Sequence, residues 1–184
     1  MLLILDIDET LVHATEAPLD IDIPHDFSFS RYFVYKRPHL DEFIDFCMDR
    51  FDVALWTSST AGYAAIMADE LFKNKHLQFI WSRKRCTQRI NNEDKCYIWL
   101  KKLSKVKKLG FRLEKILVVD DSPEKHEKNY GNLIQVRPFT GNLADTELLV
   151  LMQYLDDLKY AENVRHIEKR LWQNTYLCPT RTHP

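Results

Sequence analysis

The sequence predicts an α/β fold with a central parallel sheet and helices on both faces. Three largely apolar runs, at residues 1–5, 51–56 and 115–119, have the composition of strands that are buried on both faces, and helical patterns follow them along the chain. The carboxyl ends of parallel strands meet at one edge of a sheet. We therefore expect the polar residues that follow these runs to share one crevice.

Length and composition indicate one globular domain. The chain has 184 residues, 45% of them hydrophobic, and a formal net charge of -1, which gives no general attraction to nucleic acid or to an anionic membrane. The four cysteines lack the spacing of a zinc site, so we expect reduced thiols. No signal peptide or membrane-spanning run is recognisable, because Asp6 interrupts the first apolar run. These features predict a soluble intracellular protein, cytoplasmic or, in a eukaryote, nuclear, without a membrane partner.

The N-terminal half should contain a flap, two helices and the second core strand. Residues 13–36 read as a loop or hairpin flap above the crevice, with a strand of aromatic and β-branched residues at 31–36. Pro38 should open a helix with apolar residues at helical spacing. Strand 51–56 then leads to hydroxyl residues, Ser58 or Ser59 among them, that can cap a helix ending near Phe72.

The second half should complete the sheet and add an insertion. Residues 76–99 suggest a small inserted sheet, and 100–109 a lysine-rich amphipathic helix closed by Gly110. A helix should start at Pro123, a strand should cover 133–136, and a helix should carry the apolar stripe from Leu148 to Leu158. We expect a domain over 1–160 and a helical extension with a tail over 161–184, frayed from about Asn174 and without a catalytic role.

The first strand ends in two carboxylates two positions apart, Asp6 and Asp8. Such a pair could be a cation site, a nucleophile with its acid/base partner, or ordinary turn residues. The acids Asp120 and Asp121 follow another strand, and carboxylate oxygens suit Mg²⁺ better than zinc, which would favour His or Cys. A Mg²⁺ ion held by few carboxylates takes its remaining ligands from water and substrate phosphate, which suits phosphoryl transfer.

Residues 6–13, Asp-Ile-Asp-Glu-Thr-Leu-Val-His, resemble the Asp-x-Asp-x-Thr motif of the haloacid dehalogenase superfamily. The resemblance extends over about 1–160, through segments 33–39, 56–57 and 129–132, and is greatest to the branch containing the phosphatases of the RNA polymerase II C-terminal domain. It implies a Rossmann-like fold without a large cap. It further implies that Asp6 attacks phosphorus to form an aspartyl-phosphate and that Asp8 is the general acid/base.

The same resemblance assigns the remaining site residues. Thr57, with Ser58 beside it, matches the hydroxyl motif that binds a phosphoryl oxygen. The lysine motif, whose ammonium binds and neutralises the transferring group, fits Lys101 best, with Lys102 as the alternative. The expected metal site comprises Asp6, Asp8 through its backbone carbonyl, Asp121 as the direct ligand of the acid pair, and Asp120 as its support.

These features predict a Mg²⁺-dependent phosphomonoester hydrolase, with phosphoserine or phosphothreonine in a protein or peptide as the leading substrate. One alternative keeps the chemistry but has a small metabolite or a nucleic-acid terminal phosphate as substrate. Another is an inactive phosphopeptide-binding module, against which the retention of every catalytic group argues. The absence of room for a large cap between Thr10 and Thr57 favours an open site and a macromolecular substrate.

Overall fold

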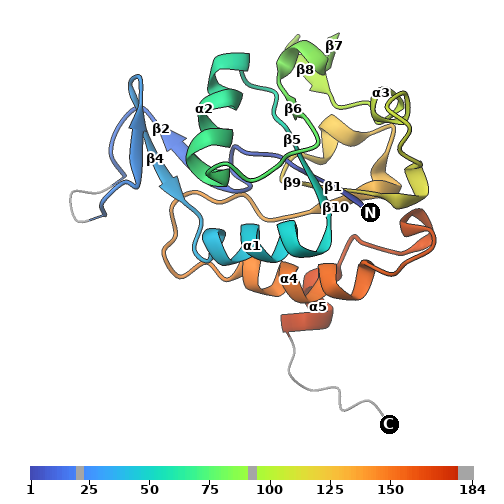
Figure 1. Ribbon diagram of the computed structural model, residues 1–184. Helices are drawn as coiled ribbons and strands as arrows, with labels where there is room; N and C mark the ends of the chain where they lie inside the picture. Colours follow the sequence, from blue (N-terminus) through green and yellow to red (C-terminus); the bar gives the residue numbers. More distant parts are fainter. Residues whose placement is uncertain (20–22, 91–94, 178–184) are drawn as a thin grey trace.

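The computed structural model describes residues 1–19, 23–90 and 95–177, and its centre is the predicted parallel sheet. Five strands lie in the order β10-β9-β1-β5-β6, and every neighbouring pair is parallel. The expected α/β fold is therefore confirmed (Figure 1). The strands are β1 (Leu2–Leu5), β5 (Asp52–Trp56), β6 (Ile80–Trp81), β9 (Ile116–Asp120) and β10 (Leu133–Gln135).

Both faces of the sheet are covered, which explains why the core strands are apolar without alternation. Leu3 and Leu5 belong to a core shared with α1 (Leu40–Arg50), α2 (Ala61–Phe72) and α4 (Glu147–Leu158). Leu2 and Ile4 face the opposite way, into a second core with Val106 of the short helix α3 (Ser104–Lys107). Successive side chains of a strand point to opposite faces, so a run that is buried on both must be apolar throughout.

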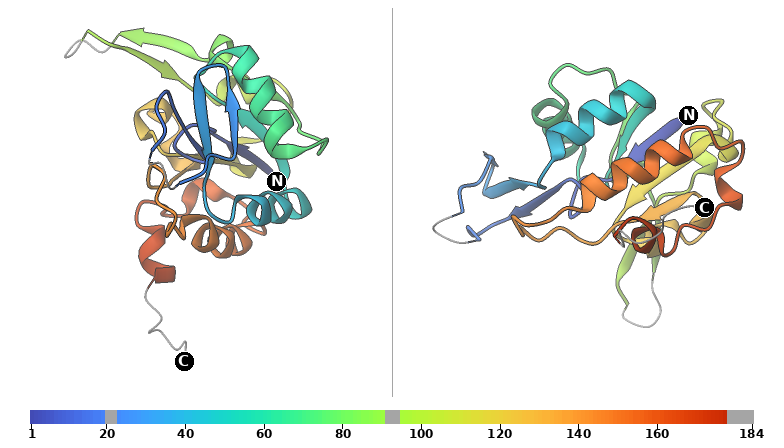
Figure 2. Two further views of the ribbon diagram at one scale, coloured as in Figure 1. Left: turned by 90° about the vertical axis from the view of Figure 1, so that its left-hand side faces the viewer. Right: turned by 90° about the horizontal axis from the view of Figure 1, so that it is seen from below.

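The predicted flap is a three-stranded antiparallel sheet in the order β2-β4-β3. It consists of β2 (Val12–Thr15), β3 (Phe27–Phe29) and β4 (Tyr32–Lys36), and it projects from the body of the protein (Figures 1 and 2). Its base is fixed by the buried Arg37, whose guanidinium donates to Asp145 at 2.9 and 2.8 Å and to the carbonyl of Thr10 at 3.1 Å. Arg37 thus joins the flap to the loop that follows β1.

The inserted sheet is smaller than predicted. Only the hairpin of β7 (Thr87–Ile90) and β8 (Tyr97–Leu100) is separate, whereas Ile80–Trp81 extends the central sheet as β6. The reason is packing, because Trp81 lies against Trp56 of β5 with ring centroids 4.9 Å apart. The prediction that 76–99 form one insertion is therefore wrong for β6, and residues 91–94 lie outside the described residues.

Two helix predictions also change. The expected helix over 100–109 is wrong, because Leu100 completes β8 and only α3 is helical. Pro123 opens a single 3-10 turn, η3 (Pro123–His126), instead of a longer helix. Gly110 does lie in a left-handed conformation, at φ 95°, in the turn after α3. The remaining 3-10 turns are η1 (Arg83–Arg85), η2 (Leu113–Lys115), η4 (Tyr130–Asn132) and η5 (Val164–His166).

The chain beyond 160 packs onto α4. A terminal helix, α5 (Trp172–Leu177), buries Trp172, whose ring stacks on Tyr154 at 5.3 Å between centroids. The expected fraying from Asn174 is thus wrong as far as Leu177, and 178–184 lie outside the described residues. Within the described ranges, no helix has the length and apolar character needed to cross a bilayer.

Candidate active site

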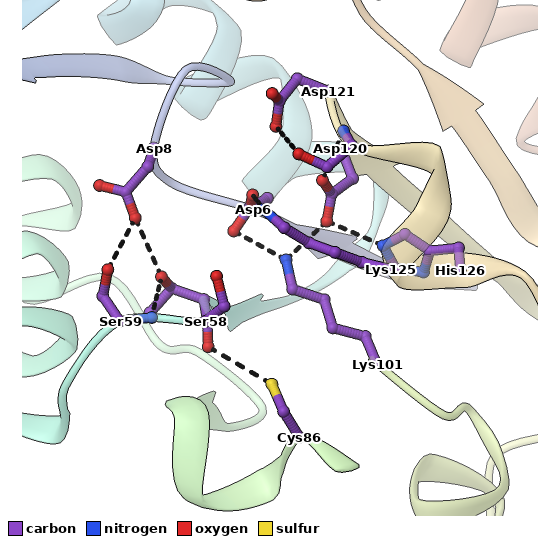
Figure 3. A network of polar contacts seen from close by, with 12 residues as sticks. Asp6, Asp8, Ser58, Ser59, Cys86, Lys101, Asp120, Asp121, Lys125 and His126 are labelled. Carbon is purple, nitrogen blue, oxygen red and sulfur yellow. Dashed lines mark hydrogen bonds and ion pairs between the residues drawn. The ribbon is translucent and has the colours of Figure 1, made fainter. Parts of the chain in front are cut away.

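The carboxyl edge of the sheet gathers the predicted residues into one site (Figure 3). Asp6 follows β1, Thr57 follows β5, and Asp120 ends β9. Lys101 arrives from outside the sheet, directly after β8, and its backbone N–H donates to the carbonyl of Lys125 at 2.8 Å. Four segments of the chain therefore meet here: the three strand ends that the parallel sheet predicts and the segment of Lys101, which the family resemblance indicated.

Lys101 lies between two buried carboxylates. Its Nζ is 2.8 Å from Oδ1 of Asp6 and 2.5 Å from Oδ2 of Asp120, and its side chain is 1% exposed. Burial opposes its charge, but Asp120 and Asp6 outweigh this effect and raise the pKa of Lys101. Lys102 is partly exposed and has no ion pair to these acids, so the structure brings Lys101 to the site and leaves Lys102 outside it.

Asp120 is saturated by donors within the protein. Its Oδ1 accepts from the backbone N–H of Ser122 at 2.9 Å, and its Oδ2 lies 2.8 Å from Nε2 of the buried His126 as well as beside Lys101. Burial acts to raise the pKa of Asp120, but Lys101 and His126 hold it well below its usual range. An ionised carboxylate with these contacts is suited to support its neighbours.

The carboxylate oxygens of Asp6 differ from those of Asp120 in having few donors around them. It is 1% exposed, and within the described chain neither carboxylate oxygen accepts a hydrogen bond of ordinary geometry, although Lys101 is close. Burial, followed by the charge of Asp120, raises the pKa of Asp6 to about 7. A buried carboxylate without hydrogen bonds is costly, so this side chain is prepared for a ligand that compensates its charge.

The acids of the site fit a divalent cation. Carboxylate oxygens of Asp6, Asp120 and Asp121 lie within 4.8 Å of one another, and oxygen donors of this kind suit Mg²⁺. Asp121 is half-buried, and burial together with Asp120 raises its pKa. Because the oxygens of Asp120 have donors already, Asp6 and Asp121 are the better candidates for direct ligands. The carboxylate of Asp8, a member of the expected metal set, lies outside this cluster.

Asp8 points instead toward α2 and is held by hydroxyl groups (Figure 3). Its Oδ2 accepts from Thr57 Oγ1 at 3.1 Å and from Ser59 Oγ at 3.0 Å, and its Oδ1 accepts from the hydroxyl of Tyr63. Burial, followed by the charge of Asp8, raises the pKa of Tyr63 well above its usual value, so that hydroxyl stays protonated and donates. The carboxylate of Asp8 is thus surrounded by neutral hydroxyl donors, although Asp6, two residues earlier in the chain, lies among charged groups.

The hydroxyl residue that caps α2 is not the one that the sequence predicts. Thr60 caps α2 by accepting from the N–H of Tyr63 at 3.3 Å, so the expected cap at Ser58 or Ser59 is wrong. Ser58 contributes its backbone carbonyl, which accepts from Arg83 at 2.6 Å. With Thr60 as the cap, the hydroxyl of Ser59 is free to contact Asp8.

Sequence reasoning missed Ser59, Tyr63, Lys125 and His126. The sequence indicates Ser59 only as a helix cap, and Tyr63 only as one apolar position of a helix. The signal for Tyr63 is its place three residues after Thr60, in the first turn of α2, directly beyond the hydroxyl-rich end of β5. Lys125 and His126 follow the acid pair by four and five residues, and only η3 turns them back toward the site.

The fold and this site together define a phosphatase of the haloacid dehalogenase class. The sequence profile of the NLI interacting factor-like phosphatases matches residues 1–165, and the chain belongs to that family. The resemblance identified from the Asp6–Thr10 motif is therefore confirmed.

Individual relatives agree with this assignment. The chain is 30% identical over 182 residues to the CTD nuclear envelope phosphatase 1 homolog of Drosophila melanogaster, covering 91% of this chain and 71% of the relative. It is 31% identical over 173 residues to the CTD small phosphatase-like protein of Homo sapiens, covering 91% and 59%. A solved structure of Fcp1, an essential RNA polymerase II CTD phosphatase, superposes with a TM-score of 0.67 at 17% identity, covering 85% of this chain and 61% of that one, which supports the fold. The chain spans only part of each of these proteins.

Proposed function

We propose that this protein hydrolyses phosphoserine or phosphothreonine monoesters in proteins, with Asp6 as the nucleophile and Asp8 as the general acid/base. The observation that carries the proposal is the contrast between these two aspartates. The carboxylate of Asp6 is buried, ion-paired and, within the described residues, without a hydrogen bond, whereas that of Asp8 is held by three hydroxyl groups. Two carboxylates in such different environments can divide nucleophilic and proton-transfer work.

In the first half of the reaction, an oxygen of Asp6 attacks phosphorus while the bond from phosphorus to the serine or threonine oxygen breaks. Asp8 gives its proton to that leaving oxygen, so the alcohol departs neutral and Asp6 carries the phosphoryl group. In the second half, Asp8 takes a proton from water, the water oxygen attacks phosphorus, and the bond to Asp6 breaks. Inorganic phosphate leaves and both aspartates are restored.

The surrounding residues support these steps. Lys101 neutralises Asp6 and Asp120 and remains beside the phosphoryl group, and Thr57 supplies a hydroxyl at the same edge of the sheet. Asp6 and Asp121, with the backbone carbonyl of Asp8, would hold Mg²⁺ and Asp120 would orient them. Bound there, the ion supplies charge neutralisation of the phosphoryl oxygens.

A protein substrate is favoured by the open approach to Asp8. A hollow of about 280 Å³ beside this residue is lined by flap residues, including Phe29 and Tyr32, and by Arg83. Its walls come from the flap, α2 and η1, and no cap domain covers it within the described chain. An extended peptide can enter such a site, and relatives named as CTD phosphatases are consistent with a phosphoprotein substrate. A substrate of this kind would place the protein inside the cell.

The test is a substrate panel with Mg²⁺ and with a chelator. We expect hydrolysis of phosphoserine and phosphothreonine peptides to exceed that of sugar phosphates and of 3′- or 5′-phosphorylated oligonucleotides, and chelation to abolish it. Preference for a sugar phosphate or an oligonucleotide end would favour the alternative substrates. Tight peptide binding without turnover would indicate a binding module instead.

A further inference from the structure

Two lysines approach the nucleophile, and they approach different oxygens. Lys101 lies 2.8 Å from Oδ1 of Asp6, and Lys125 lies 3.7 Å from Oδ2. The surroundings favour the charged form of both lysines. Burial opposes the charge of Lys125, but the negative charges of Asp6 and then Asp120 outweigh burial and raise the pKa of Lys125. Asp6 is therefore flanked by a cation on each side.

The backbone of Lys125 is fixed on both sides. Its N–H donates to the carbonyl of Ser122 at 3.2 Å, and its own carbonyl accepts from the N–H of Lys101 at 2.8 Å. The next residue, His126, is held by Asp120 at 2.8 Å. The side chain of Lys125 thus starts from a backbone turn that hydrogen bonds hold in place. The conformation of this turn directs the ammonium group toward Asp6.

The two ammonium groups differ in what they can still bind. Lys101 contacts two carboxylate oxygens at hydrogen-bond distance and is 1% exposed. The side chain of Lys125 is 18% exposed, and within the described residues its Nζ has no hydrogen bond, because 3.7 Å exceeds hydrogen-bond length. Its three N–H donors therefore have no hydrogen-bond partner among the described residues, and solvent reaches part of the side chain.

The charge balance of the site indicates what the ammonium group of Lys125 contributes. Asp6, Asp120 and Asp121 carry three negative charges against the single positive charge of Lys101, so a divalent cation alone would only bring this set to neutrality. Lys125 adds one positive charge and makes the metal-loaded set net positive. A phosphate dianion is then attracted to the site instead of meeting no net charge.

We propose that Lys125 is a second catalytic cation, whose ammonium binds an oxygen of the transferring phosphoryl group on the Oδ2 side of Asp6. This inference rests on the proposed function and adds to it a residue that the sequence motifs do not assign. Lys101, in contrast, chiefly holds Asp6 and Asp120 in place, because its ammonium already donates a hydrogen bond to Asp120 and is ion-paired with Asp6.

The experiment compares Lys125→Gln with Lys128→Gln, a matched change three residues along, on a 69% exposed side chain that forms an ion pair with Glu127. Inorganic phosphate is titrated calorimetrically into each protein in the presence of Mg²⁺, and kcat/KM is measured with an aryl phosphate. We expect Lys125→Gln to weaken phosphate binding and lower kcat/KM by roughly 10- to 100-fold. Lys128→Gln should match the wild type, and Lys125→Arg should recover most of the loss.

Unchanged phosphate affinity in Lys125→Gln would overturn the proposal, and so would an equal loss in Lys128→Gln, which would indicate only a diffuse field. If Lys125→Gln fails to fold by circular dichroism, Lys125→Met, which keeps the aliphatic stem, replaces it with the same expectation. The phosphate titration does not require turnover. Should the wild type hydrolyse no phosphoester, the proposed function fails while this titration still tests Lys125.

Discussion

Asp6 and Asp8 are two residues apart in the chain, yet their surroundings have little in common. Asp6 lies in a buried ionic cluster with Lys101, Asp120 and Asp121, and its pKa is raised to about 7. Asp8 lies among the hydroxyl groups of Thr57, Ser59 and Tyr63. The same side chain thus meets charge in one place and neutral donors in the other.

Position along the sheet edge sets the role of each acid. Asp6 follows directly from β1 and stays between β9 and the segment after β8, whereas Asp8 lies in the turn toward the flap and faces α2. A carboxylate with unengaged oxygens beside cations suits attack on phosphorus. One held by hydroxyl groups beside an open hollow suits proton exchange with a leaving group or water.

The largest effect is expected from Asp6→Asn. Because the amide cannot form the phosphoryl intermediate, turnover of an aryl phosphate should fall by roughly 10⁴-fold or more. Asp8→Asn should retain the first half-reaction with an aryl phosphate, whose leaving group needs little protonation, and lose it with a phosphoserine peptide. Single-turnover kinetics with both substrates measures this, and equal losses in the two variants would remove the division of roles.

The ionic side is tested by Lys101→Gln against Lys102→Gln. Removing the buried cation takes away the ammonium that Asp6 and Asp120 share, so the metal-free protein should lose about 3–5 kcal/mol of its free energy of unfolding. The neighbouring lysine is partly exposed, and its replacement should change stability by less than about 0.5 kcal/mol. Urea unfolding at neutral pH measures the free energy of unfolding of both variants. Similar losses in the two would mean that the ion pairs of Lys101 contribute little to stability.

A third prediction concerns the dependence of Mg²⁺ affinity on pH. The pKa of Asp6 in the metal-free protein is about 7, above its usual value, so a proton competes with the cation below that pH. Apparent Mg²⁺ affinity should therefore rise about tenfold per pH unit up to about pH 7 and level off above it. Calorimetric titration between about pH 5.5 and 8.5 measures this, with Asp121→Asn as a variant that should bind weakly throughout. An affinity independent of pH would contradict the raised pKa.

The smallest effect is expected on the hydroxyl side. Tyr63→Phe removes one of three donors to Asp8 while the other two remain, so kcat should fall by about tenfold. Tyr32 lines the same hollow but forms no hydrogen bond with Asp8, so Tyr32→Phe serves as the matched control. A loss of equal size in both variants would indicate that Tyr63 shapes the hollow and does not position Asp8.

Much of this arrangement follows from local sequence. The buried strands and the acids or hydroxyl groups at their ends predict the fold and the meeting of Asp6, Thr57 and Asp120, because parallel strands share one polarity. Tertiary contacts determine the rest. Ile80–Trp81 joins the central sheet because Trp81 packs on Trp56, and Lys125 reaches Asp6 only through the turn of η3. Neither contact leaves a periodic pattern in the sequence.

Acid quenching during turnover shows whether Asp6 itself accepts the phosphoryl group. The enzyme is mixed with an aryl phosphate and Mg²⁺, quenched within the first turnover, digested, and mapped by mass spectrometry. We expect a phosphoryl group on the peptide that contains Asp6, and none in Asp6→Asn. A phosphoryl group on another residue, or continued turnover without any phosphorylated enzyme, would contradict it.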